Sequence, residues 1–107
     1  MKTFEEFTEK SKYNRYDYLI YKLFWLKDMQ SLLSIIRLTE IPTGYIDFYS
    51  FIPLAKLKDG VLIDINSNDN LSIIQGVFEP NVLYSSRDLK SVKKEIYLLD
   101  NIDKYNL

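Results

Sequence analysis

The stretch Tyr-Ile-Asp-Phe-Tyr-Ser-Phe-Ile-Pro-Leu-Ala-Lys-Leu-Lys-Asp-Gly-Val-Leu-Ile-Asp-Ile, residues 45–65, decides the expected fold. Its first part, Tyr45–Ile52, is mostly aromatic or β-branched, which favours a strand. We expect this strand to end at Pro53, because proline cannot donate to a sheet ladder. Asp59-Gly60 is a turn signal, and Val61–Ile65 follows it as a further strand. The stretch therefore predicts part of an antiparallel sheet.

Downstream of this stretch the pattern predicts a central hairpin. Asn66–Asn70 is a polar turn of five residues, and Leu71–Phe78 returns as a strand. Val82–Tyr84 follows as a short edge strand. Ser85 or Ser86 then caps a last helix. Its apolar residues recur at helical spacing on one side: Leu89, Val92, Ile96 and Leu99.

Upstream of residue 45 the spacing favours helices. Thr3 and Glu6 have capping-box spacing, which predicts a helix from Phe4 to about Lys12. A second helix is expected from near Arg15, capped by Asn14 and extending to about Leu38 unless it breaks near Asp28. Large residues follow one helical face of it: Leu19, Leu23, Leu26, Gln30 and Leu33. The segment Leu32–Thr39 stays ambiguous, since its Ile and Thr residues also favour strand.

The expected architecture is thus an α+β fold. It comprises N-terminal helices, an antiparallel sheet with a central hairpin, and a C-terminal helix packed on the sheet. With 107 residues and no visible repeat or linker, residues 1–107 are expected to form a single domain.

The composition excludes several kinds of chemistry. The chain has no cysteine and no histidine, so disulfides, thiol catalysis, the Ser-His-Asp triad and the usual Cys/His zinc sites cannot form. The net charge of −1 argues against a general polyanion binder. No apolar stretch is long enough to span a membrane, and the N-terminus does not resemble a signal peptide. We expect a cytoplasmic protein that is not an enzyme, carries no cofactor and has no membrane partner.

Residues 64–71 resemble a calcium-binding loop in one respect, because oxygen-bearing side chains alternate from Asp64 onward. However, Asp69 replaces the glycine that allows the sharp turn, and Gln75 replaces the bidentate glutamate. We therefore expect no metal site and interpret the segment as a polar hairpin loop.

The segment between Asp59 and Ser86 contains no Lys or Arg but several acidic residues. Such a segment would attract a basic partner, since complementary fields accelerate association. A solubilising loop is the alternative. The candidate partner-binding residues are Asp64, Asn66, Asp69 and Glu79, with the tyrosines Tyr45, Tyr49 and Tyr84 as aromatic anchors. No catalytic residue is predicted.

A basic face on the last helix offers a second interpretation. Arg87, Lys90 and Lys94 align on it and could contact phosphates, with Tyr97 or Tyr84 stacking on bases. A solvated helix face, with its charge offset by acidic neighbours, is the competing interpretation.

The C-terminal half resembles the SUKH superfamily, whose many bacterial members are immunity proteins against polymorphic toxins. The resemblance rests on Phe51-Ile-Pro53-Leu-Ala55, then Gly60-Val-Leu-Ile-Asp64-Ile-Asn66, then Tyr84-Ser-Ser86 before the last helix. It covers about residues 48–100. The chain departs from that pattern upstream, because Ile41-Pro42 is followed by Tyr45 but by no Asn-Gly. The resemblance implies an α+β fold that neutralises a toxin by binding.

The leading hypothesis is therefore a small cytoplasmic inhibitor that acts by protein–protein binding. Its partner would be a basic toxin or nuclease whose active site it masks. A phage-encoded anti-defence inhibitor would use the same physics, and a small nucleic-acid-binding module that uses the last helix is the alternative from another class.

Overall fold

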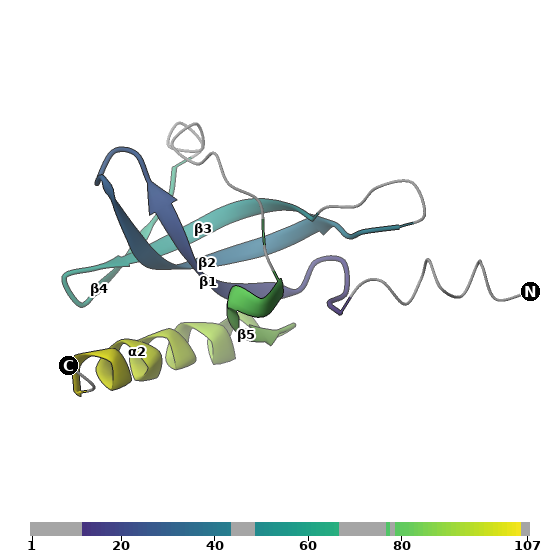
Figure 1. Cartoon of the computed structure of the whole chain (residues 1–107). Coiled ribbons are helices and arrows are strands. Elements are labelled where there is room, and N and C mark those ends of the chain that lie inside the picture. Colours follow the sequence, from purple (N-terminus) through teal and green to yellow (C-terminus); the bar gives the residue numbers. More distant parts are fainter. Residues whose placement is uncertain (1–11, 44–48, 67–76, 78, 106–107) are drawn as a thin grey trace, which may run out of the picture.

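The computed structural model describes residues 12–43, 49–66, 77 and 79–105. These residues form a five-stranded antiparallel sheet with strand order β4-β3-β2-β1-β5 and a helix against one face (Figure 1). The elements are β1 (Tyr18–Trp25), β2 (Gln30–Glu40), β3 (Ser50–Lys58), β4 (Val61–Asp64), the 3₁₀ turn η2 (Glu79–Asn81), β5 (Val82–Ser86) and α2 (Leu89–Tyr105).

The predicted layout with N-terminal helices is wrong. The segment expected to be helical from Arg15 to Leu38 is a β-hairpin, in which β1 and β2 pair from Tyr18 opposite Arg37 to Trp25 opposite Gln30. The expected helix from Phe4 to about Lys12 lies almost wholly outside the described residues, as do residues 71–76 and 78 of the expected strand Leu71–Phe78.

The hairpin escaped prediction because both of its faces are buried. In β1 the residues Leu19, Leu23 and Trp25 point to one face, while Ile20 points to the other. A strand buried on both sides has a nearly continuous apolar sequence, so the alternation of a one-sided strand is lost. The same run of large residues then fits helical spacing by chance.

Two apolar clusters hold the sheet, one on each face. The first cluster contains Leu19, Tyr21, Leu23, Trp25, Ile36, Leu38 and Tyr49. The second contains Ile20, Leu33, Ile35, Ala55 and Leu57 together with Val92 and Ile96 of α2. The predicted apolar stripe of the last helix is therefore confirmed, and α2 runs along the face that carries the second cluster (Figure 1).

Strand β3 does not end at Pro53, as the sequence predicts, but continues through it. The β2–β3 register shifts at this point, because Ile35 faces Ala55 while Ile36 faces Pro53, which leaves Leu54 as an extra residue. A bulge interrupts the hydrogen-bond ladder locally, so the missing N–H of proline is tolerated there.

The start of α2 also differs in detail from the prediction. Asp88, rather than a serine, caps the helix: its carboxylate accepts a hydrogen bond from the backbone N–H of Lys90 at 3.2 Å and another from the Ser91 hydroxyl at 2.8 Å. The Ser86 hydroxyl accepts the backbone N–H of Asp88 at 3.0 Å, so it supports the cap from two residues earlier.

The buried hairpin makes a direct prediction about stability. Ile36→Ala should lower the free energy of unfolding by about 2–5 kcal/mol, because Ile36 is fully buried and its loss leaves a cavity. Ile52→Ala, the same change at a position that is 44% exposed, should cost less than about 1 kcal/mol. Urea denaturation followed by the fluorescence of Trp25 measures both, and equal losses would contradict this sheet.

Candidate functional site

An ion-pair cluster ties the tip of the β1–β2 hairpin to β3. Asp28 lies in the turn between the two strands, and its side chain is only 6% exposed. Its carboxylate pairs with Lys56 at 2.6 Å through one oxygen and with Lys58 at 2.7 Å through the other. The two lysines are alternate residues of one strand, so their side chains project from the same face.

Trp25 and Ser34 form the floor beneath this cluster. The ammonium nitrogen of Lys56 lies 4.8 Å from the centre of the Trp25 ring, within range of a cation–π interaction. The indole N–H of Trp25 donates to the Ser34 hydroxyl at 2.9 Å, and that hydroxyl donates to the carbonyl of Leu32 at 2.9 Å. The buried polar atoms of this floor are therefore hydrogen-bonded, as a stable interior requires.

The charges of the cluster are fixed near neutral pH. Hydrogen bonds from Lys56 and Lys58 hold the pKa of Asp28 below its ordinary value, while burial opposes them. The hydrogen bond to Asp28 likewise raises the pKa of Lys58. Both pKa values move away from neutrality, whereas a proton-transfer group needs a pKa near the working pH. This arrangement suits a structural clamp better than an acid or a base.

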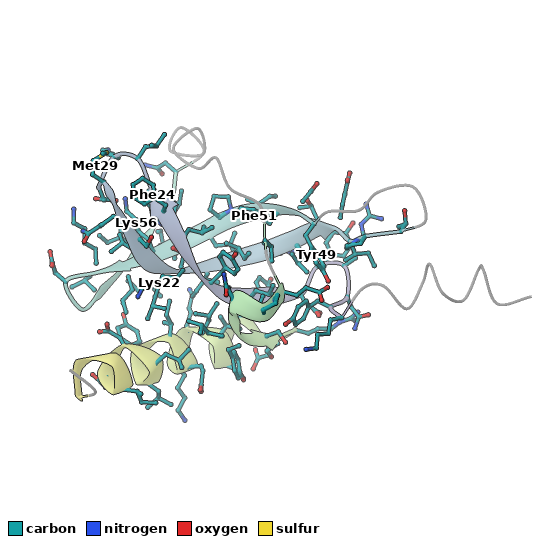
Figure 2. All side chains as sticks on the ribbon, viewed as in Figure 1. Lys22, Phe24, Met29, Tyr49, Phe51 and Lys56 are labelled. Atoms are coloured by element: carbon teal, nitrogen blue, oxygen red, sulfur yellow. The ribbon has the colours of Figure 1, made fainter. Side chains whose placement is uncertain are left out.

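Exposed apolar side chains surround the clamp, and we call them the tip surface: Leu26, Met29, Val61 and Ile63. Val61 faces Lys58 and Ile63 faces Lys56 across the β3–β4 ladder, so both lie on the face of the clamp. Met29, which is 73% exposed, follows Asp28 directly (Figure 2). The two strands and the turn thus bring together residues that are more than thirty positions apart in the sequence.

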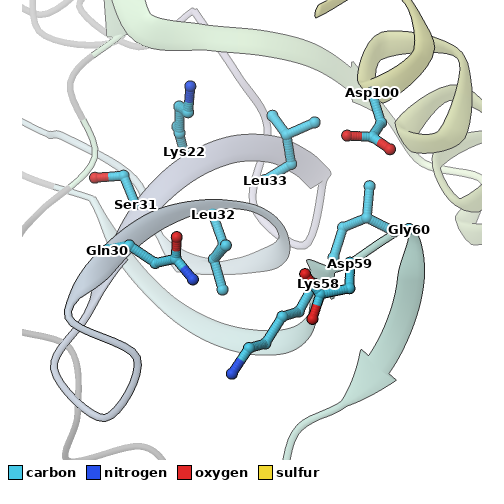
Figure 3. Close-up of a pocket in the computed structure, with 10 residues that line it drawn as sticks. Lys22, Gln30, Ser31, Leu32, Leu33, Lys58, Asp59, Gly60 and Asp100 are labelled. Atoms are coloured by element: carbon cyan, nitrogen blue, oxygen red, sulfur yellow. The ribbon is translucent and has the colours of Figure 1, made fainter. Parts of the chain in front are cut away.

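A pocket of about 510 Å³ opens on the other side of the tip, near the C-terminal part of α2 (Figure 3). It is lined by Lys22, Gln30, Ser31, Leu32, Leu33, Leu57, Lys58, Asp59, Gly60 and Asp100. Lys22 and Asp100 approach it from β1 and α2 respectively (Figure 3). Because the lining mixes both signs of charge with leucines, it selects no particular class of ligand.

The predicted partner-binding residues occupy different environments. Asp64 ends β4 and is exposed, and Asn66 just beyond it is exposed as well. Tyr84 is half-buried against the second apolar cluster. Tyr45 and Asp69 lie outside the described residues.

Tyr49 and Glu79 meet in the interior rather than on the surface. Tyr49 is only 6% exposed. Its hydroxyl donates a hydrogen bond to the carboxylate of Glu79 and accepts one from the backbone N–H of Lys12 at 3.3 Å. The Tyr13 ring packs 6.1 Å from that of Tyr49. Burial, together with the charge of Glu79, raises the pKa of Tyr13. The expectation that Tyr49 is an exposed anchor is therefore wrong, because this pair closes the end of the sheet.

The predicted basic face of α2 is present only in part, because Arg87 precedes the helix. Lys90 and Lys94 are exposed on it, and Tyr97 is exposed as well. Arg87 is exposed just before the helix and pairs with Asp17 at 3.3 Å. Within the part of the chain that the structure describes, no group of three or more acidic residues is placed to hold a metal ion.

Comparisons with known proteins give no relative. No family model matches the chain, and neither a curated protein nor a solved structure is significantly similar to it. The resemblance to the SUKH superfamily therefore stays a prediction. Among the described residues no helix is both long enough and apolar enough to cross a membrane.

The clamp predicts a pH-dependent contribution to stability. Asp28→Asn should lower the free energy of unfolding at neutral pH by about 1–3 kcal/mol, because two lysines lose a charged acceptor. The pKa of Asp28 in the folded protein lies below its ordinary value near 3.8, so this contribution is complete above that value and is lost as the pH falls through the folded pKa.

Urea titrations near pH 7 and near pH 3 measure the difference between wild type and Asp28→Asn. It should shrink at the lower pH. Asp64→Asn, a change at an exposed carboxylate, provides the control and should have little effect at either pH. A difference for Asp28→Asn that is independent of pH would contradict the clamp.

Proposed function

We propose that this chain is a binding protein that inhibits a protein partner, and that edge strand β4 is the centre of its binding surface. The exposed side chains of β4 carry this proposal. Among the described residues β4 pairs with β3 alone, and Val61 and Ile63 stay exposed on it. Edge strands are usually protected by short length, charged side chains, proline or a bulge. Strand β4, Val-Leu-Ile-Asp, is short and ends in a charged residue, but it contains neither lysine nor proline.

The backbone of β4 supports addition of a partner strand. The N–H of Ile65 donates to the carbonyl of Leu54 in β3 at 3.0 Å. In an antiparallel ladder the N–H groups alternate in direction, so those of Leu62 and Asp64 point away from β3. A partner in extended conformation could use these N–H groups, while its side chains contact Val61 and Ile63.

Charge favours a basic partner segment. Asp59 precedes β4 and Asp64 ends it, and both are exposed. Asp28 offsets one of the two positive charges that Lys56 and Lys58 carry beside β4. A strand flanked by carboxylates would steer and orient a segment rich in Lys or Arg. A toxin or nuclease that binds nucleic acid offers such segments, which fits an immunity protein acting in the cytoplasm. An anti-defence inhibitor would use the same surface.

The basic face of α2 supports one competing function, a nucleic-acid-binding module. Its exposed Lys90, Lys94 and Tyr97 could contact phosphates and a base. This function predicts affinity for oligonucleotides that falls steeply as salt rises, whereas the protein-binding proposal predicts none.

A matched pair of variants tests strand addition. The full chain is immobilised to isolate the partner from cells of the source organism, and the purified partner is then titrated against variants. Asp64→Ala should weaken binding modestly through the lost charge. Asp64→Pro loses the same charge and also an outward N–H that β3 does not use, so it should bind at least about tenfold more weakly than Asp64→Ala.

Glu40→Lys, a charge reversal at an exposed carboxylate beyond the clamp, is the control and should leave affinity unchanged. Equal affinities for Asp64→Pro and Asp64→Ala would rule out strand addition. Loss of binding in Glu40→Lys would show that the surface lies elsewhere.

A further inference from the structure

A second charged cluster lies at the end of the sheet that is remote from the clamp. Arg37 of β2 faces Tyr18 of β1 in the first pair of the hairpin ladder, while the clamp lies beyond the last pair. The guanidinium carbon of Arg37 is 5.0 Å from the centre of the Tyr16 ring and 5.7 Å from that of Tyr18. Two tyrosine rings therefore fix the position of this guanidinium, and neither ring can neutralise its charge.

Arg37 has no anionic partner among the described residues. Its Nε is buried and makes no hydrogen bond, and no described carboxylate forms an ion pair with the guanidinium. A partly buried charge without a partner is unfavourable, and proteins normally pair it. Arg87, by contrast, pairs with Asp17 although its side chain is 74% exposed. Arg37 is thus more buried than Arg87, yet among the described residues only Arg87 has a carboxylate partner.

Arg15 adds a second guanidinium at the same ring. Its guanidinium carbon lies 5.2 Å from the centre of the Tyr16 ring, and its Nε donates to the carbonyl of Thr39 at 2.8 Å. That hydrogen bond orients the side chain without compensating its charge. The neighbouring carboxylate of Asp17 is already engaged, since it accepts the backbone N–H of Asn14 at 2.9 Å and pairs with Arg87. Two positive charges therefore share one tyrosine.

The backbone at Tyr16 is held in an unfavourable conformation. Its φ of 72° lies in the left-handed region, which is unfavourable for a bulky residue. The N–H of Tyr16 donates to the carbonyl of Leu38 at 2.9 Å, and the backbone carbonyl of Asp17 accepts the N–H of Leu38 at 2.9 Å, so the sheet maintains this conformation. As a result the Tyr16 ring stays half exposed, with the guanidiniums of Arg15 and Arg37 both close to it. Strained residues of this kind concentrate at ligand sites.

We propose that Arg15 and Arg37 form a binding site for a phosphomonoester group, with Tyr16 and Tyr18 orienting the two guanidiniums. A phosphomonoester carries close to two negative charges near neutral pH and offers three acceptor oxygens. Two guanidinium forks match both the charge and the oxygens, since arginine binds phosphate in a bidentate manner. The site does not depend on β4 or on a protein partner.

A nucleic-acid strand fits this site less well. A nucleic-acid strand carries one phosphodiester charge per nucleotide, so it requires a track of basic residues. Arg87 follows Ser86, which pairs with Tyr18 in the sheet, but Arg87 is already paired with Asp17. Stacking of a base also requires a free aromatic face, whereas the Tyr16 ring already contacts two guanidiniums.

NMR titration of the full, isotope-labelled chain tests the proposal. The probes are inorganic phosphate, O-phosphoserine and a phosphoserine peptide, each added at constant ionic strength. The Nε–Hε signals of Arg15 and Arg37 should shift and saturate. Arg37→Gln should weaken binding at least about tenfold, because a charge-assisted pair is lost. Arg87→Gln, which removes an exposed and paired arginine, should change the affinity less than about twofold.

The three probes show which kind of molecule carries the phosphate group. Tighter binding of O-phosphoserine than of the peptide indicates a small phosphorylated molecule. Tighter binding of the peptide indicates a phosphorylated protein. Arg15→Gln and Arg37→Lys, which keeps the charge but loses the fork, repeat the test if Arg37→Gln does not fold. No saturable shift in the wild type, equal losses in Arg37→Gln and Arg87→Gln, or tighter binding of a glutamate peptide or an oligonucleotide would each overturn the proposal.

Discussion

The position of the β1–β2 turn relative to β3 depends on the ion pairs that Asp28 makes with Lys56 and Lys58. They join the turn of the β1–β2 hairpin to β3, between residues about thirty positions apart. Removal of a carboxylate from water is unfavourable, and two lysines compensate for it. The Trp25 ring in turn stabilises the ammonium group of Lys56. Because β4 is paired to β3, the same contacts fix the edge strand and the tip surface relative to the hairpin.

The two ends of the sheet show how differently buried charge can be handled. At the clamp each charge has a partner, and the pKa shifts of Asp28 and Lys58 favour their ionised forms. At the other end Arg37 has aromatic neighbours but no acid among the described residues. In the first arrangement the charges are paired within the protein, whereas in the second no described acid pairs with Arg37, which supports the phosphate site that we propose there. Whether a buried charge is paired within the protein thus helps to distinguish a structural role from a binding role.

The sequence predicts the parts of the fold that are governed by local rules. The apolar stripe from Leu89 to Leu99 requires only helical spacing. The turn at Asp59-Gly60 requires only residues that accept positive φ, and both residues have a positive φ. The β1–β2 hairpin could not be recognised in this way, because Leu19 and Ile20 are both fully buried on opposite faces. The candidate sites were missed for a related reason. Asp28, Lys56 and Lys58 form no recognisable motif in the sequence, because only the sheet brings them together. Tyr49 is buried because it packs in the first apolar cluster, where its hydroxyl meets Glu79 from another segment.

A double-mutant cycle between Asp28 and Lys56 tests the central claim most directly. Asp28→Asn, Lys56→Met and the double variant are compared with wild type by urea denaturation. If the clamp holds the hairpin to β3, the coupling free energy should be at least about 1 kcal/mol in favour of the pair, since the two groups are in contact and largely buried. Additive effects, with a coupling near zero, would show that the turn and β3 are held independently.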